Sequence, residues 1–146
     1  MESGIAEATT PGATGSKTIA DLLPAAAREH GSGRAILYKD ESGAWVGKSY
    51  SEVSEIVRDL SLGLIDLGIA KGDKVSILAN TRPEWTYFDF AALTAGATVV
   101  PIYQTNSPEE CQYVLENSDA KAVIVEETSS WRRSAGSASA VPGSST

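Results

Sequence analysis

The stretch that decides the fold is residues 74–126, KVSILANTRPEWTYFDFAALTAGATVVPIYQTNSPEECQYVLENSDAKAVIVE. It contains three short apolar runs, at Lys74–Ala79, at Ala97–Tyr103 and in AKAVIVE at 120–126, separated by two segments with helical spacing. Continuous apolar strands that alternate with helices are typical of a parallel sheet covered on both faces. Right-handed crossovers join such strands. The stretch therefore predicts the opening part of a doubly wound α/β fold.

The second helical segment of this stretch has a clear beginning. Ser107 is placed as N-cap, Pro108 as the first helical residue and Glu110 as its third, which together form a capping box. Cys111 falls at helical spacing with Val114 and Leu115. We expect it to be a small buried hydrophobic residue rather than a nucleophile.

The residues before this stretch predict a helix and then a β-hairpin. Thr18 can cap a helix that runs to about Glu29, with Asp21 at the third position and Pro24 as a source of a kink or a broken start. Strands at Ala35–Lys39 and Ala44–Lys48 then flank the turn sequence DESG.

A long amphipathic helix follows the hairpin. We expect Ser51 to be its N-cap and Gly68 to end it, because glycine adopts the left-handed conformation found after helix ends. Its apolar residues repeat at intervals of three and four and predict a core-facing stripe: Val53, Ile56, Val57, Leu60, Leu64 and Leu67.

Ligands of open α/β sheets bind beyond the carboxyl ends of the strands. Two loops occupy such positions, ANTRPEW at 79–85 and YQTNSPEE at 103–110. Each leads into a helix N-terminus, where free N–H groups can hold an anion, and Arg82 adds positive charge. The alternative is that Asn80, Thr81 and Ser107 simply cap helices, and the residue types favour this alternative.

The aromatic residues after the first loop favour packing over binding. Trp85, Phe88 and Ala92 share one face of the helix that follows, and we expect them to pack on the sheet. His30 is the sole histidine of the chain and lies at a helix end, so neither a metal nor a catalytic role is expected for it.

Composition excludes several classes of protein. The formal net charge of −7 disfavours a nucleic-acid partner, because phosphate contacts need clustered Lys and Arg. A single cysteine allows no internal disulfide and suits a reducing compartment. No apolar run reaches the roughly 18 residues of a membrane span, and the first residues lack the features of a secretion signal. These features predict a cytoplasmic protein, with peripheral membrane contact left open.

Two segments carry a resemblance to a known family. LANTRPEWTYFDFAALTAGATVVPIYQTNSPEECQYVLENSDAKAVIVE at 78–126 resembles the N-terminal region of AMP-forming acyl-CoA synthetases of the adenylate-forming superfamily, and is most similar to the long-chain fatty acid–CoA ligases. YSEVSEIVRDLSLGLIDLGIAKGDKVSIL at 50–78 matches the helix, turn and strand that precede it in that family. The resemblance covers about Thr18 to Glu127.

The resemblance implies a two-step reaction. A fatty acid carboxylate attacks the α-phosphate of ATP to give acyl-AMP and pyrophosphate, and the thiol of CoA then displaces AMP. Fatty acid, ATP, Mg²⁺ and CoA are implied for the full-length family member. The family's ATP-binding and catalytic motifs would lie beyond Glu127, so we assign no catalytic, cofactor-binding or metal residue to this chain and expect it to be inactive alone.

Three regions are therefore predicted: a disordered leader at 1–16, the N-terminal portion of an AMP-binding domain at 17–127, and a disordered tail at 128–146. Seven of the nineteen tail residues are serine, and most of the others are Ala, Arg and Gly. A linker, a basic contact element at Arg132–Arg133 and a GC-rich gene read in a shifted frame are the three interpretations of this tail, and the shifted frame fits the abrupt change of composition best.

Two other functions remain open at this point. One is a non-catalytic module that binds an acyl chain or a protein partner. The other is a small flavodoxin-like nucleotide protein, which the lack of a glycine-rich first strand–helix turn disfavours.

Overall fold

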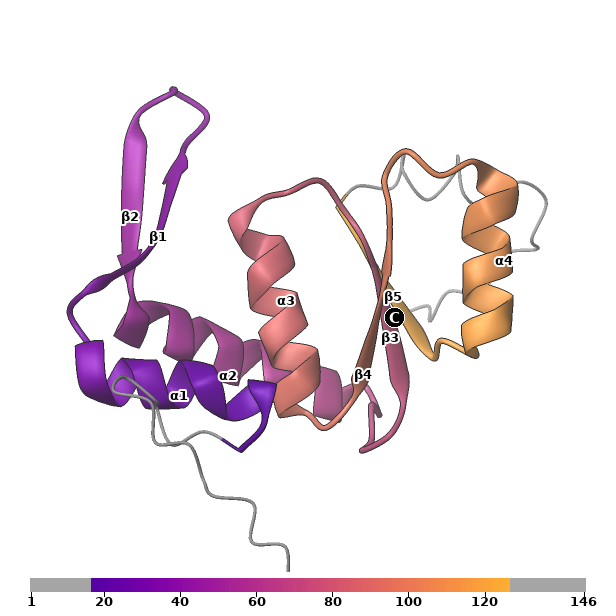
Figure 1. The fold of residues 1–146 in the computed structure, drawn as a ribbon, viewed down its shortest axis with the longest axis horizontal. Coiled ribbons are helices and arrows are strands. Elements are labelled where there is room, and N and C mark those ends of the chain that lie inside the picture. Colours follow the sequence, from indigo (N-terminus) through magenta and orange to yellow (C-terminus); the bar gives the residue numbers. More distant parts are fainter. Residues whose placement is uncertain (1–16, 127–146) are drawn as a thin grey trace, which may run out of the picture.

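The fold combines a projecting hairpin, a group of three helices and a small parallel sheet (Figure 1). A computed structural model describes residues 17–126. Its elements are α1 (Ile19–His30), β1 (Arg34–Lys39), β2 (Trp45–Ser49), α2 (Tyr50–Asp66), β3 (Lys74–Leu78), α3 (Pro83–Thr94), β4 (Thr98–Ile102), α4 (Pro108–Ser118) and β5 (Ala122–Val125). The predicted leader at 1–16 and the predicted tail at 128–146 lie outside the described residues. No helix within residues 17–126 combines the length and apolar character needed to cross a membrane.

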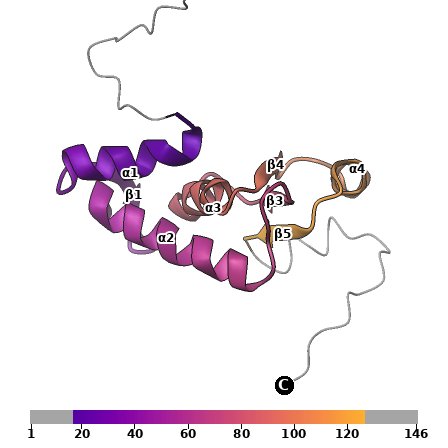
Figure 2. The same ribbon diagram turned by 90° about the horizontal axis from the view of Figure 1, so that it is seen from below.

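The three-stranded sheet has the order β4-β3-β5, and both pairs are parallel. Helix α3 connects β3 to β4, and α4 connects β4 to β5. Figure 2 shows α3 on one side of the strands and α4 on the other. The chain thus crosses opposite faces of the sheet in its two connections, which confirms the predicted doubly wound α/β arrangement. The antiparallel pair of β1 and β2 confirms the predicted hairpin.

Alternate residues of each strand divide the core in two. Val75 of β3 packs in a cluster with residues of α1, α2 and α3, and Val99 and Ile124 lie against the same cluster. Leu78 and Ile102 belong to a second cluster with Cys111 of α4. The Cys111 side chain is 1% exposed, as predicted for a small buried hydrophobic residue. Both faces of the short sheet are therefore covered by helices, which explains why its strands are mostly apolar.

Glycine ends helix α2 as predicted. Gly68 has a φ of 92°, a backbone conformation that residues with a Cβ atom rarely adopt. Its N–H donates to the carbonyl of Ile65 at 2.9 Å, and the N–H of Ile69 donates to the carbonyl of Leu64 at 3.0 Å. These two bonds form a Schellman motif, in which the flanking apolar residues meet. Leu64 and Ile69 are both buried, so the helix end also adds to the core.

Two predictions about α2 are wrong. Its N-cap is Ser49 rather than Ser51: the Ser49 hydroxyl accepts from the Glu52 N–H at 3.2 Å, and the Glu52 carboxylate accepts from the Ser49 N–H at 2.8 Å. A capping box needs an acidic residue or Gln three positions on, which Ser51 lacks. Leu67 is 81% exposed and does not join the buried stripe, because it is the C-cap residue, beyond the last helical turn.

Helix α1 begins as predicted but is not broken. The Thr18 N–H donates to the Asp21 carboxylate at 2.9 Å, which places Thr18 as N-cap. The helix continues through Pro24 to His30, so the proline does not break its start. Leu23 and Ala25, on either side of the proline, are both buried. This tertiary packing offsets the hydrogen bond that proline cannot donate.

Candidate functional site

The carboxyl ends of β3 and β4 form a cleft. Because α3 and α4 leave these neighbouring strands toward opposite faces, the two loops diverge at this edge, as they do in ligand-binding crevices of open α/β sheets. The cleft has a volume of about 280 Å³. Thr81 and Trp85 line one side of it, and Tyr103, Gln104 and Thr105 line the other. None of its lining residues within the described chain carries a charge.

A second cavity lies next to this cleft, between the end of β5 and helix α3. It has a volume of about 190 Å³. Its walls are mostly apolar and include Ile77, Phe88 and Ile124, whereas charged side chains stand among its other lining residues. Ala79 and Trp85 line both cavities, so the loop after β3 and the first turn of α3 form a shared wall.

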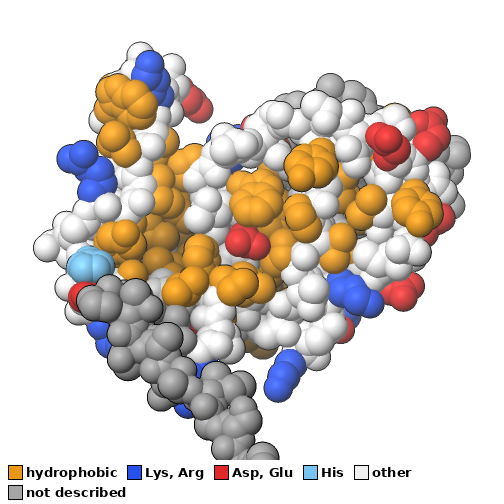
Figure 3. Space-filling model, viewed as in Figure 1, with side chains coloured by type: hydrophobic (Ala, Val, Ile, Leu, Met, Phe, Trp, Pro, Cys, Tyr) orange, Lys and Arg blue, Asp and Glu red, His pale blue; other side chains and the backbone are white. Residues whose placement is uncertain are grey.

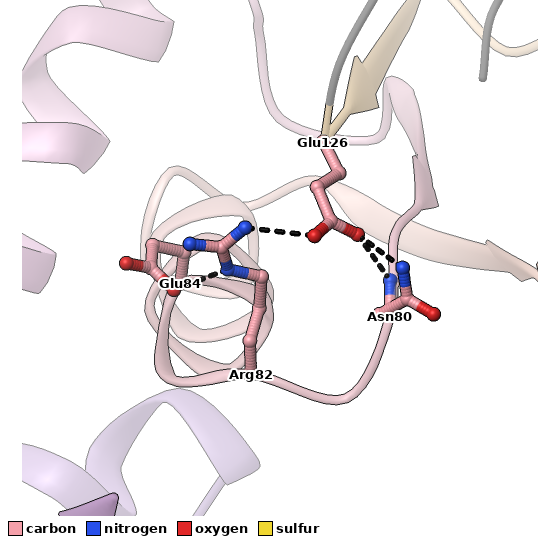
Figure 4. A network of polar contacts seen from close by, with 4 residues as sticks. All are labelled: Asn80, Arg82, Glu84 and Glu126. Carbon is pink, nitrogen blue, oxygen red and sulfur yellow. Dashed lines mark hydrogen bonds and ion pairs between the residues drawn. The ribbon is translucent and has the colours of Figure 1, made fainter. Parts of the chain in front are cut away.

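Four polar residues are connected at this edge (Figure 4). One oxygen of the Glu126 carboxylate accepts hydrogen bonds from the Asn80 backbone N–H at 2.9 Å and from Asn80 Nδ2 at 2.6 Å. The other oxygen accepts from Arg82 Nη1 at 2.8 Å. Arg82 Nε in turn donates to the Glu84 carboxylate at 2.7 Å. Glu126 follows β5 directly, so the network joins the end of one strand to the loop after another.

The network fixes the charge state of its members. Hydrogen bonds from the backbone and side chain of Asn80, together with Arg82, lower the pKa of Glu126. The pKa of Glu84 is lowered by its hydrogen bond from Arg82, and the pKa of Arg82 is raised by Glu84 and Glu126. Arg82 therefore lies between two ionised carboxylates. The two carboxylates offset its positive charge, which argues against an anion-binding role for Arg82.

The two helix N-termini at this edge differ. At α4 the Ser107 hydroxyl accepts from the Glu110 N–H at 3.2 Å, so Ser107 caps the helix as predicted. At α3 the N-cap residue is Arg82, and neither Asn80 nor Thr81 caps the helix. The predicted caps fail here because Pro83 is the first helical residue, which places the start of the helix after Thr81 and leaves Asn80 to bond with Glu126.

Other residues singled out from the sequence lie elsewhere. His30 is at the exposed end of α1, 3.8 Å from the Glu29 carboxylate, and its ring is 5.8 Å from that of Tyr50. On α3, Ala92 is fully buried, whereas Trp85 and Phe88 are only half-buried because they face the small cavity. Within residues 17–126 no group of three or more His, Cys, Asp or Glu side chains could hold a metal ion.

Sequence reasoning missed Glu126. It lies 46 residues from Asn80 and 44 residues from Arg82, so no local pattern links them. Its position at the end of the third parallel strand was the available signal, because the carboxyl ends of parallel strands meet at one edge. Sequence reasoning also did not single out Asp89, which lies four residues after Trp85 on α3. Burial raises the pKa of the Asp89 carboxyl.

The family model described as AMP-binding enzyme matches residues 23–144. The long-chain-fatty-acid–CoA ligase FadD15 of Mycobacterium bovis is 43% identical over 84 residues, which is 58% of this chain and 14% of that protein. The long-chain-fatty-acid–CoA ligase ACSBG2 of Gallus gallus is 33% identical over 115 residues, 79% of this chain and 15% of that protein. The chain thus spans about one seventh of the length of these curated relatives.

Solved structures show the same fold. The inhibitor-bound N-terminal domain of FACL13 from Mycobacterium tuberculosis superposes with a TM-score of 0.68 at 26% identity, covering 75% of this chain and 27% of that one. The N-terminal subdomain of Klebsiella oxytoca NpsA, in complex with 3-hydroxyanthranilyl-AMSN, gives a TM-score of 0.70 at 22% identity, covering 86% of this chain and 28% of that one.

Proposed function

Because this chain belongs to the AMP-binding enzyme family, we propose that it is the N-terminal portion of an ATP-dependent long-chain fatty acid–CoA ligase. The observation that carries the proposal is the 43% identity to a mycobacterial long-chain-fatty-acid–CoA ligase over 84 residues. The share of that relative that the chain covers, 14%, and the likeness to solved N-terminal domains support the assignment to an N-terminal portion. A cytoplasmic location is part of the same proposal.

The full-length reaction joins a fatty acid to CoA at the expense of ATP. The carboxylate oxygen attacks the α-phosphorus and pyrophosphate leaves, which gives the acyl group a good leaving group. The CoA sulfur then attacks the acyl carbon, and AMP leaves with the bonding electrons. Charge develops on phosphoryl oxygens in the first step, so the reaction needs cations or preorganised hydrogen-bond donors around them.

We propose that this chain alone does not catalyse the reaction. The carboxyl edge of its sheet carries Glu84 and Glu126, and the first turn of α4 adds Glu109 and Glu110. Arg82 is already paired with two of these carboxylates. The local charge therefore disfavours a triphosphate. The described residues do not fit a Mg²⁺ site either, since they hold no group of three or more acidic or other ligating side chains suited to a metal, and Glu84 and Glu126 are both paired with Arg82.

The contribution of the chain to a ligase can be tested by a chimera. The 84 residues of the mycobacterial FadD15 that match this chain are replaced by the corresponding residues of this chain, and acyl-CoA formation from palmitate, ATP and CoA is measured. We expect the chimera to form the thioester. A matched chimera with Val75→Asp, which places a charge at a fully buried position, is expected to be inactive. A folded but inactive chimera without that substitution would refute the assignment.

The inactivity of the chain alone needs a separate assay. The purified 146-residue protein is incubated with palmitate, ATP and labelled pyrophosphate, and exchange of label into ATP is followed with intact FadD15 as positive control. We expect no exchange above background. Exchange of labelled pyrophosphate into ATP by the chain alone would show that it binds ATP and activates palmitate, contrary to the proposal.

A second candidate is a non-catalytic module that binds an acyl chain or a protein partner. Exposed hydrophobic side chains favour it: Trp45 of the hairpin is 65% exposed, and Leu62 and Ile65 of α2 are also exposed. Figure 3 shows hydrophobic side chains gathered on the hairpin and across the face in view. Calorimetric titration with laurate distinguishes the two candidates, because saturable binding at a fixed stoichiometry favours the module and its absence counts against an acyl-binding role.

A further inference from the structure

The hydrogen bonds of Glu126 restrain the loop after β3, which forms one wall of the cleft. Glu126 bonds to the backbone of Asn80 as well as to its side chain, so it restrains the main chain of the loop and not only a rotamer. It also bonds to Arg82, which is the N-cap residue of α3. The side chain of Glu126 is 20% exposed, whereas that of Arg82 is 44% exposed, so the carboxylate is the better shielded member of the pair.

The restraint reaches Trp85 through the first turn of α3. The Trp85 N–H donates to the Arg82 carbonyl at 3.1 Å. A displacement of Arg82 would therefore also displace the first turn of the helix. Trp85 lines both the cleft between β3 and β4 and the smaller cavity beside β5. A change at Glu126 would therefore alter both the backbone of the loop and the aromatic wall of the cleft.

We propose that Glu126 is a positioning residue that sets the shape of the cleft at the carboxyl edge of the sheet, acting through Asn80, Arg82 and Trp85. It is not a catalytic residue, because its carboxylate is engaged by the loop. Its removal releases the loop from β5 and exposes the indole of Trp85. The cleft then loses the wall that Thr81 and Trp85 provide.

The chain offers a matched control at the other end of β5. Lys121 precedes this strand, and its ammonium group lies 2.7 Å from the Asp73 carboxylate, which precedes β3. Lys121 also donates to the Gly68 carbonyl at 2.7 Å. This ion pair also joins β5 to the segment before β3, but at the amino edge of the sheet, away from the cleft. Loss of either carboxylate removes one link between the same two strands.

The experiment measures the environment of Trp85 in the folded chain. Trp45 and Trp131 are replaced by phenylalanine so that Trp85 is the sole tryptophan, and its emission maximum and quenching by acrylamide are recorded. We expect Glu126→Gln to shift the emission to longer wavelength and to increase the quenching constant. Asp73→Asn is expected to leave both unchanged, even where it lowers the melting temperature by a similar amount.

A second variant keeps the proposal testable if Glu126→Gln does not fold. Asn80→Ala removes the Nδ2 bond but keeps the backbone bond to Glu126, so a smaller change of the same sign is expected. Unchanged Trp85 fluorescence in the folded Glu126→Gln variant, or in Asn80→Ala if the first does not fold, overturns the proposal. An equal change in Asp73→Asn also overturns it, since the effect would then reflect general loss of stability. The readout does not depend on whether the chain activates fatty acids.

Discussion

Replacing Ser76 by alanine should stabilise the protein, although Ser76 lies in the middle of the central strand. The residue is 0% exposed, and its hydroxyl has no hydrogen-bond partner among the described residues. Its neighbours across the sheet are Val100 of β4 and Val123 of β5. The hydroxyl therefore loses its hydration on folding and gains nothing in return.

The size of the effect follows from this imbalance. A buried polar group without a partner costs about 1–3 kcal/mol. Alanine removes that cost but has a slightly lower preference for strands, which offsets a few tenths of a kcal/mol. We expect Ser76→Ala to raise the free energy of unfolding by about 1 kcal/mol. The adjacent Val75 is equally buried but apolar, so Val75→Ala creates a cavity and should lower the free energy of unfolding by about 2 kcal/mol.

Urea unfolding followed by circular dichroism measures both variants. The midpoint of Ser76→Ala should rise and that of Val75→Ala should fall, with the slope of free energy against urea unchanged in both. Tyr87→Phe removes a second unpartnered buried hydroxyl and should behave as Ser76→Ala does. A loss of stability in Ser76→Ala comparable to that in Val75→Ala would refute the reasoning, because it would mean that the hydroxyl contributes more by packing than it costs by desolvation.

Three further predictions concern helix ends, pH and the thiol. Gly68→Ala should lower the free energy of unfolding by about 1 kcal/mol because Gly68 has a φ of 92°. Gly63→Ala within α2, where an added Cβ meets nothing within 4 Å, should raise it by about 0.5–1 kcal/mol. Chemical unfolding of the two variants checks that the two changes have opposite signs. The pKa values of Glu126 and Asp73 are lowered in the folded state by hydrogen bonds from Asn80 and Lys121, so the stability they add is present above the pKa of the unfolded carboxyls and is lost as the pH falls through their folded pKa. The melting temperature should therefore fall in acid, and the fall should be shallower in a Glu126→Gln, Asp73→Asn double variant; equal slopes would contradict this. Cys111 is 1% exposed and should react with Ellman's reagent only on unfolding, so rapid reaction in native buffer would show that the contact between α4 and the sheet opens readily.

The sequence predicts a helix cap correctly where the residues that form it are close together in the chain. The capping box at Ser107 was identified correctly because both of its partners lie within three residues. The cap of α2 was placed two residues late because Ser49 and Ser51 are both capable residues, and only the Glu52 carboxylate distinguishes them. Asn80 was assigned to a helix cap because the competing partner, Glu126, is remote in the chain.

The sequence alone determined the order and type of the helices and strands, and which family the chain resembles. Capping boxes, glycines after helices and apolar spacing act between residues at most a few positions apart, so chain order contains them. The tertiary structure decided that β5 lies beside β3 rather than beside β4, which precedes it in the chain. That placement brings Glu126 to Asn80 and Lys121 to Asp73 and buries Ser76 between two valines. Glu126 lies 46 residues from Asn80 and Lys121 lies 48 residues from Asp73, so no local pattern specifies these two contacts.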